Sequence, residues 1–350
     1  ADFEALSNNW ERTQLGQLAQ DEAMRPFVED MRRQIQQKLA GVRNKLGLRV
    51  TDLKGVASGE IGLALVEREN ARAAVAMTAD VTGRIDAAEE LLRKVDRELV
   101  KRGAVKSRIE SSGVTVWVYS IPPQAEGDIA REAVFLIHDD MLCGCDSRAE
   151  AEEMIQRFGG QGGDRLADVP AYVETMRRCA AEAGQLVPEV RWFLEPFGYA
   201  RAGRSLMRDG GLRRGKDYVE IFEAQGFDAV RGVGGFVNIA VRGSFELLHR
   251  TAIYAPAVPG QSDKYRMAMR MMQFPNGGNL EPQDWMPRKL ASYRTFNMDL
   301  QNAFEYFGSL FDAIAGYDDA FADVLEGLEK DPYGPQVDVE RDLVKHLGER

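Results

Sequence analysis

Apolar residues alternate with polar ones, or run together briefly, at four places in the first half of the chain. They do so over 61–65, 73–81, 114–121 and 133–137, and the last two runs are separated by two prolines and a glycine. Valine, isoleucine and aromatic residues favour strands, and turn residues between two such runs indicate a hairpin. The pattern therefore predicts two antiparallel hairpins.

A spacing of three and four residues between apolar positions predicts the helices, because such positions share one side of a helix. The spacing recurs over 3–18, 21–39, 84–100, 147–158, 172–183, 291–315 and 320–328. Ser147 and Glu150 add a capping-box pattern at the start of one of them. The order strand, strand, helix, strand, strand, helix predicts an α+β fold, with a mostly antiparallel sheet and its helices on one face.

A second unit is predicted after the glycine-rich segment 159–170, which we interpret as a domain boundary. Further strands are predicted over 190–199, 235–240, 245–254 and 265–271. Because the order of elements recurs, we expect an internal duplication at the level of pattern. The predicted division is 1–160 with the N-terminal helices and a first α+β unit, 161–280 with a second, and 281–350 as a C-terminal helical region.

Composition narrows the classes of partner. The chain has 350 residues, 44% of them hydrophobic, which is enough for a sizeable core without disulfide bonds. Its 45 Lys and Arg against 55 Asp and Glu give a net charge of -10, which repels phosphate backbones. Nucleic acid is therefore not expected as a partner. Three cysteines are too few for a disulfide scaffold.

One stretch, 201–216, is both basic and rich in glycine, and it suggests an anion-binding loop before a helix predicted at Tyr218. The candidate residues are Arg204, Arg208, Arg213, Arg214 and Lys216. The stretch lacks the Gly-Lys-Ser/Thr order of a phosphate-binding P-loop. Local neutralisation of an acidic protein, or docking of an acidic partner, therefore stays an open interpretation.

Two further clusters contain metal-binding side chains. His138, Cys143 and Cys145 lie within eight residues, and in a strand the two cysteines share one face. No second ligand cluster accompanies them in the sequence, so a polar turn and apolar filling are the expected roles. Met267 and Met269 alternate as in a copper-binding strand, but core packing is again expected. We therefore expect no metal and no cofactor.

Catalytic motifs are missing from the sequence. It contains no G-x-S-x-G, no H-E-x-x-H and no C-x-x-C, and it has three histidines. Adjacent carboxylates such as Asp139 and Asp140 do not face each other across a substrate. No catalytic residue is predicted, and a non-enzymatic protein is favoured over an enzyme.

Three stretches together resemble a family of exported bacterial proteins, abundant in planctomycetes, that is described only as a domain of unknown function. They are WERTQLGQLAQDEAMRPFVEDM, HDDMLCGCDSRAEAEEMI and VDVERDLVKHLGER. The resemblance implies export to the periplasm or cell envelope, and it implies no activity and no catalytic residue. In such families the last stretch leads into further strands, so this chain is expected to be part of a longer protein. Any membrane or envelope association would then be made by segments outside it.

These observations lead to one functional expectation and two alternatives. The expectation is a binding or assembly (scaffold) protein that takes a protein partner or forms a homo-oligomer. The first alternative is a carrier that holds an apolar ligand between its helix and sheet layers. The second is an enzyme that uses an anion held by 201–216.

Overall fold

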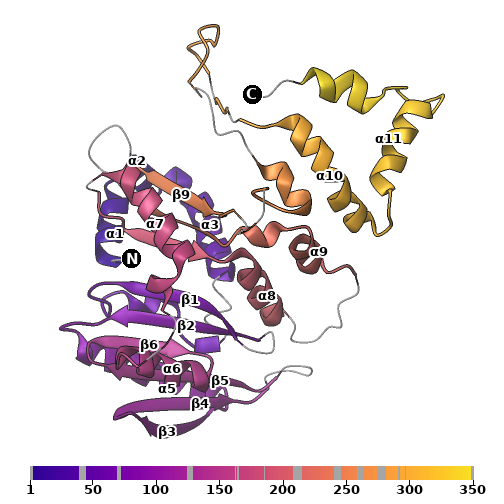
Figure 1. Ribbon diagram of the computed structural model, residues 1–350. Helices are drawn as coiled ribbons and strands as arrows, with labels where there is room; N and C mark the ends of the chain where they lie inside the picture. The colour runs from indigo at the N-terminus through magenta and orange to yellow at the C-terminus, as the bar shows by residue number, and fades with distance from the viewer. Residues whose placement is uncertain are drawn as a thin grey trace. The chain divides into compact units, whose positions relative to one another are not determined.

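Figure 1 shows the computed structural model of the chain. It describes residues 3–347 except 39–44, 69–71, 124–128, 162, 164, 185, 208–214, 240–245, 258–259, 261–262, 274–280, 291 and 296.

The larger sheet has six strands, and every neighbouring pair is antiparallel. The strands are β1 (Ile61–Arg68), β2 (Arg72–Asp80), β3 (Val105–Ser111), β4 (Val114–Ile121), β5 (Arg131–His138) and β6 (Met141–Cys145), in the order β1-β2-β6-β5-β4-β3. The predicted hairpins are confirmed as the pairs β1–β2 and β4–β5. The α+β class and the mostly antiparallel sheet are confirmed with them.

Helices cover both faces of this sheet. Val95 of α5 (Ile85–Lys101) shares a core with Tyr119 on one face. Met154 of α6 (Arg148–Phe158) shares a second core with Val116 on the other. The prediction that the helices lie on one face is wrong for this sheet. Its inner strands are buried on both sides, so each face needs an amphipathic helix to cover it.

The start of α6 follows the sequence pattern in part. The Ser147 hydroxyl accepts a hydrogen bond from the backbone N–H of Glu150, which confirms the predicted cap. The Glu150 carboxylate is buried and accepts hydrogen bonds from Arg68 and Arg157. This carboxylate therefore links α6 to the end of β1.

A smaller antiparallel sheet contains β7 (Val190–Leu194), β8 (Gly232–Asn238) and β9 (Leu248–Tyr254) in that order. One face packs against α7 (Pro170–Ala183), where Cys179 lies against Phe236. A Cβ atom at Gly232 would come within 2.6 Å of the Phe193 ring, so glycine allows this close packing. The strand predicted over 190–199 ends early, because α8 (Pro196–Met207) begins at Pro196.

The fourth strand predicted for this second unit, over 265–271, is wrong. The segment Met267–Met272 forms a 3-10 helix, and Met269 is buried beside Tyr265 and Ala229. Almost every residue in 267–272 is apolar, so the spacing of apolar residues there could not distinguish a strand from a helix. The internal duplication stays a prediction.

The chain divides into two compact units, and each includes two segments. The first unit contains 1–212 and 232–254, with both sheets and the helices α1 (Phe3–Glu11), α2 (Gln14–Leu18) and α3 (Arg25–Lys38). The second contains 213–231 and 255–350. This division differs from the predicted boundaries near 160 and 280, which remain predictions about domains.

The second unit is built around α9 (Tyr218–Ala224), α10 (Leu300–Ala315) and α11 (Ala320–Lys330). Three phenylalanines of α10, at 304, 307 and 311, surround Phe321 of α11 with ring centroids 5.4–5.6 Å apart. The three α10 rings lie on the helix predicted over 291–315, and with Phe321 they hold the two helices together.

Candidate functional site

Two of the five predicted anion-binding residues, Arg204 and Lys216, lie in the described part of the chain. Arg204 lies on α8 in the first unit, whereas Lys216 belongs to the second. The Lys216 ammonium donates to the backbone carbonyls of Ile314 and Ala315, at the end of α10. A cation at this position satisfies carbonyl groups that the helix leaves unpaired. The other candidates, Arg208, Arg213 and Arg214, lie outside the described residues.

The weak metal candidates His138, Cys143 and Cys145, for which packing was expected, contact neighbouring side chains. Cys143 and Cys145 share one face of β6, as predicted, and both thiols are buried beneath α6. Burial raises the pKa of each thiol to about 12. The His138 ring packs edge-on against Phe158. Among the described residues, no three side chains of His, Cys, Asp or Glu are placed to hold a metal ion.

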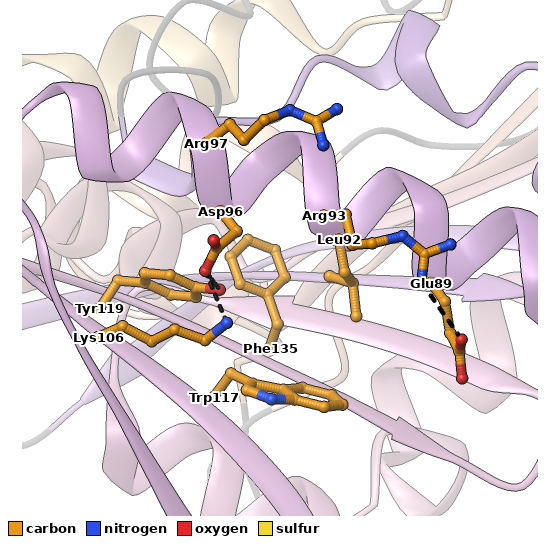
Figure 2. Close-up of a pocket in the computed structure, with 9 residues that line it drawn as sticks. All are labelled: Glu89, Leu92, Arg93, Asp96, Arg97, Lys106, Trp117, Tyr119 and Phe135. Carbon is orange, nitrogen blue, oxygen red and sulfur yellow. Dashed lines mark hydrogen bonds and ion pairs between the residues drawn. The ribbon is translucent and has the colours of Figure 1, made fainter.

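A hollow of about 400 Å³ between α5 and the strands β3, β4 and β5 is the best-formed candidate site (Figure 2). We call it the α5 hollow. Its lining residues are Glu89, Leu92, Arg93, Asp96, Arg97, Lys106, Trp117, Tyr119 and Phe135. None of them was predicted as a site residue from the sequence.

Aromatic rings form the floor of the α5 hollow. Trp117 and Tyr119 are two positions apart on β4, so both point to the face that α5 covers. Phe135 on β5 is the register partner of Trp117 and packs edge-on against the Tyr119 ring at 6.2 Å. Tyr119 and Phe135 are buried, whereas Trp117 is half-buried. The Trp117 indole is therefore the part of the floor that a ligand can reach.

A charged triad closes one end of the α5 hollow. Lys106 Nζ on β3 lies 2.6 Å from Oδ1 of Asp96, and Tyr119 Oη donates to the same oxygen at 2.8 Å. The hydrogen bond from Lys106 lowers the pKa of Asp96. Burial, together with Asp96, raises the pKa of Tyr119. At neutral pH the carboxylate is therefore charged and the phenol is a neutral donor.

The opposite rim is charged as well, and it belongs to α5. Arg93 donates from Nε to Glu90 at 3.0 Å and lies 3.6 Å from Glu89. Arg97, one helical turn further on, lies 3.7 Å from Glu90. Both guanidinium groups are exposed to solvent. The rim can therefore rearrange around a ligand, which the buried floor does not allow.

A second hollow, of about 330 Å³, lies within the second unit near the end of α10. Its polar side chains interact with the protein itself. Ser309 donates to the Gln225 side chain at 2.8 Å, and Asp312 accepts from the backbone N–H of Phe321 at 2.8 Å. These groups stabilise the helix packing, so this hollow is the weaker candidate.

No protein-family model and no curated protein sequence matches the chain. None of the helices in the described part of the chain combines the length and the apolar character that crossing a lipid bilayer requires.

Proposed function

We propose that this chain is a non-enzymatic binding protein and that the α5 hollow is its recognition site. The single observation that supports this most is the half-buried Trp117 indole on a floor of buried aromatic rings. Concave sites with an apolar floor and a few polar groups are the usual form of small-molecule sites. A partly exposed indole supplies a large contact area there.

The ionisable groups of the hollow favour recognition over catalysis. An efficient general acid or base has a pKa near the working pH. The Lys106 hydrogen bond moves the pKa of Asp96 down and burial moves that of Tyr119 up, so both move away from neutrality. Each of these two groups also has a hydrogen-bond partner within the triad. These two groups are therefore suited to presenting a fixed arrangement of charge to a ligand.

The setting we propose is outside the cytoplasm, in the periplasm or cell envelope. Its support is the family resemblance of the three sequence stretches given above. Self-assembly or a protein partner remains part of the same proposal, because a recognition site of this kind also accepts an aromatic side chain from another protein.

A fragment screen by ligand-observed NMR tests the binding proposal. We expect a set of small aromatic compounds to bind the wild-type chain and to lose binding in Trp117→Ala. Trp285→Ala is the matched control, because Trp285 is 74% exposed and belongs to the second unit. Compounds that bind Trp117→Ala as well as wild type, or a screen without any Trp117-dependent binder, would contradict the proposal.

A further inference from the structure

We infer that the α5 hollow takes a small planar aromatic anion, with its rings on Trp117 and its carboxylate on Arg93. This inference rests on the proposed binding function and names the class of ligand for that site.

The shape of the hollow suits a flat ligand of limited size. Figure 2 shows the Trp117 indole on the floor beside Phe135, with Leu92 of α5 opposite it. Aromatic rings associate by stacking offset or edge-on at such surfaces. A volume of about 400 Å³ corresponds to roughly a dozen water molecules at ~30 Å³ each. That is room for two fused rings with one polar substituent.

The hydrogen-bonding groups around the hollow favour an anion over a cation. Three cationic side chains line it, those of Arg93, Arg97 and Lys106, against the two carboxylates of Glu89 and Asp96. A third carboxylate, that of Glu90, pairs with Arg93 and Arg97 from beside the lining and balances this charge. Asp96 already accepts from two donors in the triad. An exposed indole by itself would also attract a cation. The guanidinium groups of the lining carry N–H donors, which a negatively charged acceptor can use and a cation cannot.

Arg93 is the side chain best placed to hold a carboxylate. Its Nε donates to Glu90, and its Nη1 lies 3.6 Å from Glu89, beyond hydrogen-bond distance. A guanidinium has five N–H donors in a planar fork that matches a carboxylate. Among the described contacts, the Nη groups of Arg93 make this ion pair with Glu89 but no hydrogen bond, so their N–H donors can turn to a ligand. Arg93 leaves α5 next to Leu92, on the side of the helix that faces the hollow (Figure 2).

Three matched probes test this inference: 2-naphthoate, its neutral amide 2-naphthamide, and the cation 2-naphthylmethylammonium. They have the same rings and differ in charge. The chain carries four tryptophans, so 5-fluorotryptophan labelling gives four ¹⁹F signals, and Trp117→Phe assigns the relevant one. We expect 2-naphthoate to shift the Trp117 signal with a dissociation constant at least fivefold below that of the amide, and the ammonium probe to bind weakest.

Arg93→Gln provides the decisive comparison. We expect it to remove the preference for 2-naphthoate over 2-naphthamide while leaving binding of the amide unchanged. Arg177→Gln is the control, since Arg177 is an exposed arginine on α7 that pairs with Glu174. The control should keep the preference.

The possible outcomes test the class of ligand and the binding site separately. If the amide binds as tightly as 2-naphthoate, or the ammonium binds tightest, the anion inference is overturned while the binding site stands. If the preference for 2-naphthoate survives Arg93→Gln, the assignment of the carboxylate to Arg93 is overturned. If no probe shifts the Trp117 signal, both this inference and the proposed function fail.

Discussion

The hydroxyl of Tyr119 donates a hydrogen bond to the carboxylate of Asp96 at 2.8 Å, and this bond joins β4, the strand next to the edge of the larger sheet, to α5. Lys106 reaches the same carboxylate from the neighbouring strand β3 and lies over the Tyr119 ring. One carboxylate thus connects two strands and a helix. The end of the α5 hollow is held in place by these contacts, so they are the first to test.

Replacing Tyr119 with Phe removes the donor and keeps the ring. The lost hydrogen bond goes to a charged acceptor, so we expect the free energy of unfolding to fall by about 1.5 kcal/mol. Urea unfolding followed by tryptophan fluorescence measures it. Tyr333→Phe is the control, because Tyr333 is 99% exposed and should change stability little. Equal effects of the two substitutions would contradict a structural role for the bond.

The triad of Lys106, Asp96 and Tyr119 also predicts that the free energy of unfolding depends on pH. The pKa of Asp96 is lowered in the folded protein, chiefly by the Lys106 hydrogen bond. The folded state therefore holds this proton less tightly than the unfolded state does, and the stabilisation is present above the ordinary pKa of about 3.9. It is lost as the pH falls through the lowered value.

Asp96→Asn checks that sign. Asparagine still accepts from Tyr119 but carries no charge for Lys106. We expect the difference in unfolding free energy between wild type and Asp96→Asn to be largest near neutral pH and to shrink as the pH falls below about 4. Urea unfolding at a series of pH values measures it. If the unfolding free energies of wild type and Asp96→Asn differ by the same amount throughout this pH range, the charge of Asp96 contributes nothing to stability.

Glu150 supports a larger effect on stability. Its side chain is 1% exposed and lies 2.7 Å from Arg68 and 3.0 Å from Arg157. Glu150→Gln leaves two partly buried guanidinium groups without that charge, and we expect a loss of about 3 kcal/mol. Glu152→Gln on the same helix removes only an exposed pair with Arg148 and should cost less than about 0.5 kcal/mol. Thermal unfolding of the two variants compares them.

How far the sequence predicted the fold depended on whether an element had an apolar side. The strands over 114–121 and 133–137 were predicted because they are buried on both faces. β3 was missed because its sequence, VKSRIES, is mostly polar and exposed. A charged strand at the edge of a sheet is a known way to prevent further pairing, and it carries no hydrophobic signal.

Because β3 was not predicted, the candidate site that it lines was not predicted either. The alternation of Trp117 and Tyr119 was visible in the sequence, and so was the helix over 84–100. What brings them together is register: Lys106 pairs with Tyr119, and Trp117 pairs with Phe135. Register between strands depends on the pairing of whole segments, which a single sequence does not provide. Within the basic stretch 201–216, Arg201 is helical and pairs with Glu67 of β1. The anion-binding role of the stretch stays a prediction.

The cysteines allow a test of the structural role assigned to 143–145. All three cysteines of the chain are buried, and burial raises the pKa of Cys143 and Cys145 to about 12. The thiolate is the reactive form, so at pH 8 the folded protein should react with a thiol reagent such as dithionitrobenzoate far more slowly than the unfolded protein. In urea, three thiols should react.

Added Cu(I) or Zn²⁺ should leave the slow rate of the folded protein unchanged, because the thiols are packed as apolar side chains. A thiol that reacts rapidly in the folded protein, or is protected further by either metal, would revive the metal site that the sequence first suggested.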